Sequence, residues 1–157
     1  MTLSPKGKAS KRLIYIKIAA NLIVHFAIAH KSEMNREEYI KYINTFPDVS
    51  VENPFDLTPV SEAQILVARH TDNRKWFAVI FVRNGELFVD LKCDPPYAEY
   101  LREHERGVRE GYHMNKRHWI SVYLEEASGA IVEELTNLSY WLTAAKKRGR
   151  TEQITSK

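Results

Sequence analysis

The sequence has very little cysteine, because Cys93 is the single thiol among 157 residues. One cysteine cannot form an internal disulfide, and it excludes any zinc site that requires several thiolates. The composition therefore gives no sign of an oxidising compartment, and we expect a cytoplasmic protein. Internal repeats and low-complexity stretches are also absent. At this length, these absences favour one folded domain that is large enough to bury a core.

A recognisable catalytic constellation is also lacking. The acidic side chains that stand together are adjacent pairs, Glu37/Glu38, Glu125/Glu126 and Glu133/Glu134, which on helices mostly occupy solvated faces. Cys93 falls on the expected apolar face of a strand, where a thiol behaves as a small, inert hydrophobe. No phosphate-binding loop accompanies these residues. We therefore assign no catalytic residue and no cofactor, and an enzyme is the least favoured class of function.

Metal ligands at a familiar spacing are missing as well. His104, His113 and His118 are separated by nine and five residues, which matches neither one face of a helix nor a common zinc motif. The first expected helix offers only Glu37 and Glu38 as acids, so it carries no dense acidic ridge for iron. The sequence predicts no metal site.

The charge of the chain is unevenly distributed. The formal net charge is +3, yet residues 1–33 carry six Lys/Arg and one Glu, whereas residues 34–144 carry 12 Lys/Arg and 18 Asp/Glu. The central part is therefore acidic, and the positive charge is concentrated at the two ends. Local basic clusters attract phosphate backbones, but an acidic domain disfavours nonspecific binding to duplexes.

Residues 1–33 differ in composition from the rest of the chain. Four basic residues precede an apolar run at 13–29, and Lys17, Asn21 and His25 interrupt this run at every fourth position. A helix would place the three on one narrow polar stripe. Four interpretations stay open: a signal peptide, a transmembrane helix, an amphipathic helix on a surface or partner, and an extension outside the functional domain. Any membrane contact is expected from this segment alone.

The domain proper is expected at residues 34–147, followed by a polar tail at 148–157. Asn35 and Glu38 form the pattern of a capping box, and helices are predicted near 36–45, 95–105 and 129–147. Residues 47–61 are expected to form a loop, and strands are expected at 65–70 and 118–125. The pattern predicts an α+β domain, in which helices flank an antiparallel sheet.

The clearest element is a β-hairpin within residues 75–92. Asn84-Gly85 is the dipeptide preferred in type I′ turns, and it places Arg83 opposite Glu86. Alternation then predicts two faces. One carries Ala78, Ile80, Val82, Leu87, Val89, Leu91 and Cys93, and the other carries Phe77, Val79, Phe81, Phe88, Asp90 and Lys92. Because the first strand is apolar on both faces, we expect a central position with cover on each side.

Three segments, "KWFAVI" (75–80), "DLKCDP" (90–95) and "GVREGYHMNKRHWISVYL" (107–124), resemble the MmcQ/YjbR family. The resemblance extends over roughly residues 34–145, and its last segment is the most specific. It implies a frataxin/CyaY-like α+β fold, preceded here by an additional N-terminal helical extension. Members of this family are commonly described as predicted DNA-binding proteins with a double-wing motif.

The segment from Arg106 to Trp119 is the candidate site. Its basic residues outnumber Glu110, and Tyr112 and Trp119 could stack on bases. The residues predicted to contact DNA or RNA are Arg109, His113, Asn115, Lys116, Arg117 and His118. The alternative interpretation is structural, with glycines that make turns and aromatic side chains that anchor a loop. The second class of function is accordingly a non-enzymatic protein-interaction or ligand-sensing domain.

Overall fold

The computed structural model describes residues 34–55 and 59–145. The predicted extension at 1–33 and the predicted tail at 148–157 lie outside these ranges. In chain order the elements are α2 (Arg36–Ile43), β1 (Val49–Glu52), β2 (Ile65–His70), β3 (Trp76–Arg83), β4 (Glu86–Lys92), α3 (Pro95–His104), β5 (Val108–Glu110), β6 (Trp119–Tyr123) and α4 (Gly129–Thr143). The predicted α+β class is confirmed.

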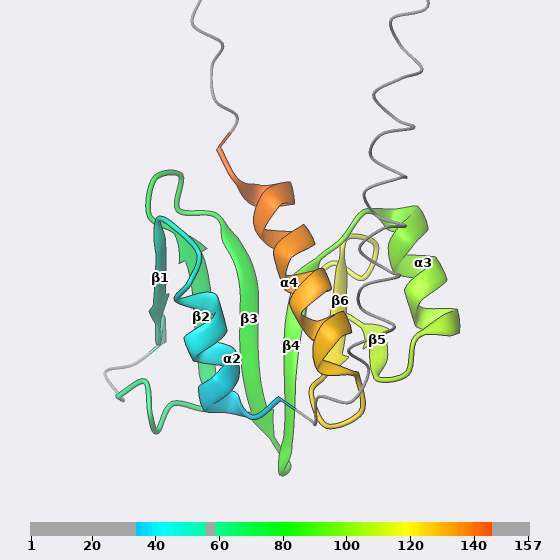
Figure 1. Ribbon diagram of the computed structural model, residues 1–157, viewed down its shortest axis with the longest axis horizontal. Coiled ribbons are helices and arrows are strands. Elements are labelled where there is room, and N and C mark those ends of the chain that lie inside the picture. The colour runs from blue at the N-terminus through cyan, green and yellow to red at the C-terminus, as the bar shows by residue number, and fades with distance from the viewer. Residues whose placement is uncertain (1–33, 56–58, 146–157) are drawn as a thin grey trace, which may run out of the picture.

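The strands form one six-stranded sheet in the order β1-β2-β3-β4-β6-β5 (Figure 1), and every pairing is antiparallel. The hairpin of β3 and β4 has the predicted register, with Arg83 opposite Glu86. Asn84 and Gly85 both have positive φ angles, 52° and 81°, as a type I′ turn requires. The strand order places β3 and β4 in the middle of the sheet, and a central position was predicted for the first of them.

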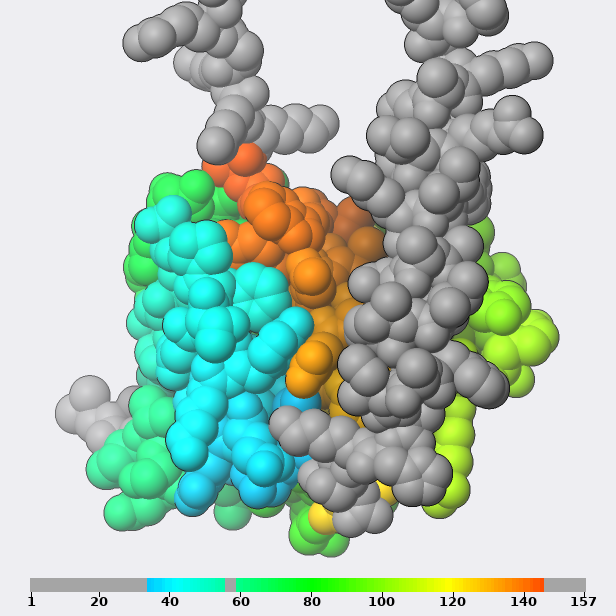
Figure 2. Space-filling model, viewed as in Figure 1, coloured from blue at the N-terminus to red at the C-terminus, as the bar shows by residue number. Residues whose placement is uncertain are grey.

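The helices cover one face of the sheet. In Figure 1, α2 and α4 lie in front of the central strands, while α3 lies beside β5 and β6. Figure 2 shows the same face, where side chains of α2 and α4 close over the sheet. The main core is buried on this face and includes Tyr39, Ile43, Ala78, Ile80, Val89, Leu91, Cys93, Leu101, Ile120, Val122 and Leu135. Cys93 is buried among these residues, as its predicted face requires.

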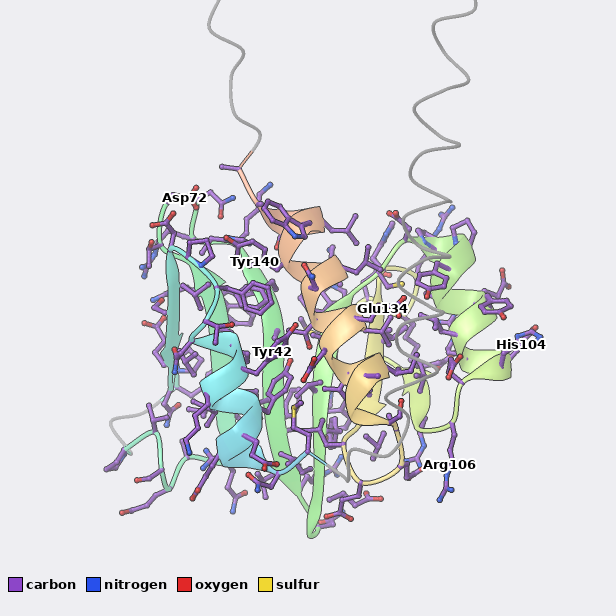
Figure 3. The ribbon with its side chains drawn as sticks, in the orientation of Figure 1. Tyr42, Asp72, His104, Arg106, Glu134 and Tyr140 are labelled. Atoms are coloured by element: carbon purple, nitrogen blue, oxygen red, sulfur yellow. The ribbon has the colours of Figure 1, made fainter. Side chains whose placement is uncertain are left out.

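The first helix begins as the sequence predicts. Asn35 Oδ1 accepts a hydrogen bond from the Glu38 N–H, and Glu38 Oε2 accepts one from the Asn35 N–H, each at 3.0 Å. Two tyrosines connect the helical layer. The Tyr42 hydroxyl on α2 donates to the Glu133 carbonyl on α4, and the Tyr140 hydroxyl donates to the Pro47 carbonyl (Figure 3).

A β-bulge in β3 corrects one predicted face. Ala68 pairs with Ala78, but Arg69 pairs with Trp76, so Phe77 is an extra residue in β3. Phe77 therefore packs in the main core, on the same face as Ala78 rather than on the face of Val79. The Ser139 hydroxyl of α4 accepts from the Lys92 N–H at 2.7 Å and donates to the Phe77 carbonyl.

Several predicted boundaries were wrong. Residues 49–52, expected in a loop, form β1 because Val49 and Ser50 pair with His70 and Arg69 of β2. The strand β5 was not predicted, since three residues are too few to show alternation. The first helix ends at Ile43 rather than at residue 45, because Asn44 caps it and the chain then turns.

The last helix ends at Thr143 rather than at residue 147. Ala144 takes an extended ψ of 148°, which stops the helical hydrogen bonding. Thr143 is held by the β2–β3 connection, since its hydroxyl bonds His70 Nε2 at 2.9 Å and its carbonyl accepts from Asn73. Within the described ranges, no helix has the length and hydropathy needed to cross a bilayer.

Candidate nucleic-acid interface

The face of the sheet opposite the helices, here called the open face, carries a second apolar cluster. Val67, Val79, Phe81 and Phe88 are buried there, although no described helix packs on them. Their cover includes Tyr112 and Met114 of the 111–118 loop and the neighbouring side chains Ile65, Trp76 and Tyr123. The predicted cover on both sides of β3 therefore exists, but a loop replaces a helix on the open face.

Aromatic rings fix the base of this loop. Phe88 is stacked between Phe81 and Tyr123, with ring centroids 5.1 and 4.9 Å away. Tyr112 meets Phe81 and Phe88 edge-on at 5.3 and 5.6 Å. Edge-to-face and offset-stacked contacts of this kind are favourable beyond the area that they bury. Tyr112 consequently acts as the anchor of the 111–118 loop.

Three cations lie over rings of the open face. The Arg109 guanidinium is 3.7 Å from the Tyr123 centroid. The Arg83 guanidinium is 4.7 Å from the Tyr112 centroid, and Lys92 Nζ is 4.9 Å from that of Trp119. Cation–π contacts hold these positive charges against the sheet without neutralising them. The open face therefore combines aromatic rings with cations.

Two glycines allow the chain to pass close to its neighbours at the ends of this region. Gly107 has a φ of +78°, and a Cβ there would lie 2.7 Å from the Ala127 nitrogen. A Cβ on Gly111 would lie 2.8 Å from the Trp119 Cβ, and the Gly111 N–H donates to the Trp119 carbonyl at 3.2 Å. The predicted structural role of both glycines fits this geometry.

Hydrogen bonds close the loop and tie it to the domain. Arg102 of α3 donates to the Lys116 carbonyl at 3.0 Å, and the Cys93 N–H donates to the His118 carbonyl at 2.9 Å. Inside the loop, Asn115 Oδ1 accepts from the Arg117 N–H at 3.0 Å. The loop is thus fixed from α3, from the end of β4 and from within.

Two of the six predicted contact residues are ion-paired. Arg109 Nη2 lies 2.5 Å from Glu126 Oε1, and Lys116 Nζ lies 2.7 Å from Glu110 Oε2. The hydrogen bond and charge of Lys116 lower the pKa of Glu110 below its ordinary value. Both pairs are solvent-exposed, so each contributes little to stability.

The other four predicted residues occupy the loop itself. Asn115 and Arg117 are exposed, and no carboxylate within residues 34–55 and 59–145 pairs with the Arg117 guanidinium. His113 is exposed at a φ of 55°, with its ring 4.1 Å from that of Tyr112. His118 is half-buried. Five of the six predicted residues therefore share the 111–118 loop, which is tied to Arg102 and Cys93, whereas Arg109 lies on β5 and is paired with Glu126.

The positions of Tyr112 and Trp119 do not fit the expectation that their rings stack on bases. Trp119 is 8% exposed, with Lys92 over its ring, and Tyr112 is committed to Phe81 and Phe88. Neither ring is presented to a base. Their expected role as anchors fits the structure, whereas stacking on bases does not.

Sequence reasoning missed a buried polar pair beneath the loop. Asp90 of β4 is fully buried beside Ser121 of β6, whose hydroxyl donates to Asp90 Oδ1 at 2.5 Å. Ser121 Oγ also accepts from the Tyr112 N–H at 3.0 Å. Burial raises the pKa of Asp90 to about 7, although the Ser121 hydroxyl and the nearby Tyr112 N–H lower it. The available signal was alternation, which places Asp90 on the face of Val79 and Phe88.

Within the part of the chain that the structure describes, no three His, Cys, Asp or Glu side chains come together as a group that could hold a metal ion. His104, one of the three histidines considered above, instead bonds the Tyr100 carbonyl through Nδ1 at 2.8 Å.

These features define a class: an α+β domain with helices on one face of an antiparallel sheet and an anchored basic loop on the other. The model of the YjbR family matches residues 44–142, more than half of the chain. The protein belongs to the YjbR family. The predicted family resemblance is thereby confirmed.

Curated relatives and solved structures agree with this assignment. The chain is 32% identical over 102 residues to YyaQ of Bacillus subtilis, covering 59% of this chain and 82% of that protein. It is 31% identical over 94 residues to YjbR of Escherichia coli K12, covering 59% and 71%. None of these names states an activity, so they show the family alone.

Two solved structures share the fold. A Pseudomonas syringae protein solved by crystallography has a TM-score of 0.61 at 32% identity, with 71% of this chain and all of that chain covered. DR2400 of Deinococcus radiodurans, described as a DUF419 domain, has a TM-score of 0.58 at 25% identity, with 76% and 84% covered. The observed architecture is thus that of solved relatives.

Proposed function

We propose that this protein binds nucleic acid, DNA or RNA, through the 111–118 loop and the adjoining Arg109. The observation that supports this most strongly is a basic loop that buried anchors hold in one shape, while Asn115, Lys116 and Arg117 lie exposed on it. A loop fixed in advance loses little conformational entropy on binding, so more of its contact energy remains as affinity. The description of MmcQ/YjbR proteins as predicted DNA-binding proteins points the same way.

The side chains suggest a division of roles. Lys116 and Arg117 would neutralise phosphates, and the exposed amide of Asn115 would donate to a base edge, because its Oδ1 already accepts from the loop. His113 and His118 would assist at the margins. Because Tyr112 and Trp119 are occupied, stacking contributes nothing, and we expect phosphate contacts to dominate.

We expect the affinity for nucleic acid to depend only modestly on salt concentration. Two to three neutralised phosphates would give a log–log salt slope of roughly −2 to −3 on duplex DNA. The excess of acidic residues in the central part of the chain weakens the attraction further. A steep slope would instead indicate binding by the basic ends of the chain.

The test compares full-length variants by fluorescence anisotropy on a short labelled duplex and on a single strand, across a salt series. Lys116→Ala/Arg117→Ala should weaken binding and flatten the slope by about two units on duplex. The matched control is Lys41→Ala/Lys75→Ala, which removes two exposed cations from α2 and the β2–β3 connection. Equal effects of the two double variants would contradict the proposal.

A second comparison removes the basic ends. Residues 34–145 are tested alone, after cooperative unfolding has shown that this fragment folds. Binding by the fragment at low salt supports the proposal. Failure of a folded fragment to bind either nucleic acid rejects it, and the alternative then takes its place: a protein-interaction or ligand-sensing domain in which the loop is a structural signature.

A further inference from the structure

Asp90 is a carboxyl group buried beneath the loop that carries the proposed contacts. It lies between Val79 of β3 and Ser121 of β6, and its exposed fraction is 0%. Oδ1 accepts from the Ser121 hydroxyl, whereas Oδ2 is buried and has no hydrogen-bond partner among the described residues. Such an atom needs a physical explanation, because an unpaired buried acceptor costs free energy and an unpaired buried charge costs far more.

A continuous chain of hydrogen bonds joins this carboxyl to the loop. The Tyr112 N–H donates to Ser121 Oγ at 3.0 Å, and Ser121 Oγ donates to Asp90 Oδ1 at 2.5 Å. Tyr112 is also the residue whose ring is wedged against Phe81 and Phe88. The backbone and the side chain of one loop residue are therefore both fixed over Asp90.

Among the described residues, no positively charged side chain forms an ion pair or hydrogen bond with Asp90. The described charged or titratable groups on the open face or in the loop are Glu52, Arg69, Arg83, Glu86, Lys92, Arg109, Tyr112, His113, Lys116, Arg117, His118 and Tyr123. Arg69 pairs with Glu52, Arg109 with Glu126, and Arg83 and Lys92 lie over aromatic rings. None of these described groups bonds to Asp90, so its ionisation would leave a buried charge on Oδ2.

We infer that Asp90 is the positioning residue of the 111–118 loop, and that its neutral form holds the loop closed while its ionised form releases it. Water at Oδ2 would stabilise the ionised form, and Tyr112, which is bonded to Ser121 and packed on Phe88, is the loop residue whose movement would admit it. The inference deepens the proposed function, because it concerns the loop assigned to nucleic acid. It predicts that this loop is better ordered below neutral pH than above it.

The free protein tests this inference without any nucleic acid. Amide exchange at Tyr112 is measured from pH 6 to pH 8 and corrected for the intrinsic pH dependence of exchange. With a pKa near 7 in the closed loop and an ordinary value in the open one, the opening equilibrium should rise about tenfold over this range. Asp90→Asn, which cannot ionise, should remove that rise.

The matched control is Glu86→Gln, which removes one carboxylate from the exposed end of the same strand. In this variant, Tyr112 exchange should depend on pH as it does in the wild type. Identical profiles for the wild type and Asp90→Asn overturn the inference. Should Asp90→Asn fail to fold, the ¹³C resonance of the Asp90 carboxyl answers the same question in the unaltered chain. Titration near neutral pH supports the inference, and titration near its ordinary value rejects it.

A binding measurement separates the proposal of nucleic-acid binding from the positioning role of Asp90. Affinity for a labelled oligonucleotide is compared at pH 6 and pH 8, where Asp90→Asn should lose less affinity than the wild type. Both proteins share every other side chain of the loop, so the comparison isolates the contribution of Asp90. Suppose that Asp90→Asn abolishes the pH-dependent rise in Tyr112 exchange, but neither protein binds the oligonucleotide. This result would reject the nucleic-acid function and support the positioning role of Asp90.

Discussion

At the scale of single residues, the buried carboxyl group of Asp90 makes the stability of this domain depend on pH near neutrality. In the folded protein its pKa is about 7, against an ordinary value of 3.8. Between these values the folded state keeps a proton that the unfolded state has lost. The contribution of Asp90 to stability therefore declines as pH rises from about 4 to about 7, and it is constant above that.

The variant Asp90→Asn should remove this decline in stability, because asparagine cannot ionise. Near pH 4 it should unfold with a free energy close to that of the wild type, and by pH 8 it should be more stable by a few kcal/mol, because it has no charge to bury. Denaturant unfolding of both proteins at several pH values measures the difference. Contributions from other groups, such as the lowered pKa of buried His70, cancel in the comparison. A difference that does not change with pH would contradict this account.

Cys93 gives a second prediction at the level of one residue. Burial raises the pKa of its thiol to about 11, so almost no thiolate is present at pH 8. Native protein should react slowly with an aromatic disulfide reagent, and denatured protein should react rapidly. The absorbance of the released thiol records both rates. Rapid labelling of the native protein would reopen a nucleophilic role for Cys93.

At the scale of elements, the contact between α4 and the sheet is more specific than apolar packing. The Ser139 hydroxyl bonds both the Lys92 N–H and the Phe77 carbonyl, just beyond the last hairpin pair, Ala78 and Leu91, where β3 carries the bulge in its pairing with β2. One side chain therefore satisfies two backbone groups that face each other across β3 and β4. This fixes where α4 sits along the hairpin.

Removal of this hydroxyl should be costly. Ser139→Ala leaves two buried backbone groups unpaired, and we expect a loss of roughly 2 to 4 kcal/mol in the free energy of unfolding. Asn137→Ala, an exposed change in the same helix, is the control for helix propensity and should have little effect. Chemical denaturation of both variants makes the comparison. Similar stabilities would mean that the two backbone groups pair directly once the hydroxyl is gone.

The elements also show what a sequence can and cannot reveal. The capping box at Asn35 and the Asn84-Gly85 turn were predicted because local chemistry decides them. The bulge at Phe77 was not, because it depends on β2 and on a serine 62 residues away along the chain. The strand β1 was missed for the same reason, since its four residues become a strand only through pairing with β2.

The candidate site also has some features that the local sequence reveals and others that depend on the folded structure. The composition of the 106–119 segment made it conspicuous, and its glycines and anchoring rings could be interpreted from local patterns. The ion pairs of Arg109 and Lys116, and the hydrogen bond from Arg102, depend on residues brought together only by folding. The burial of Asp90 likewise follows from the position of the loop above it.

At the scale of the whole molecule, the described core begins at Met34, which is buried, and the first helix has its own cap at Asn35. A chain that lacks residues 1–33 but retains Met34 should therefore unfold cooperatively, with its transition close to that of the full chain. Circular dichroism during thermal unfolding provides the measurement. Loss of the cooperative transition would show that the extension belongs to the folded domain.

The order of the strands has a consequence for how molecules of this protein behave towards one another. The outer strands of the sheet, β1 and β5, contain only four and three residues. Each also carries charge at its margin, Glu52 on one and Arg109 and Glu110 on the other. Short, charged borders offer few free backbone groups to a second chain. The protein is therefore protected against edge-to-edge polymerisation at high concentration, even though its central strands are rich in aromatic and β-branched residues.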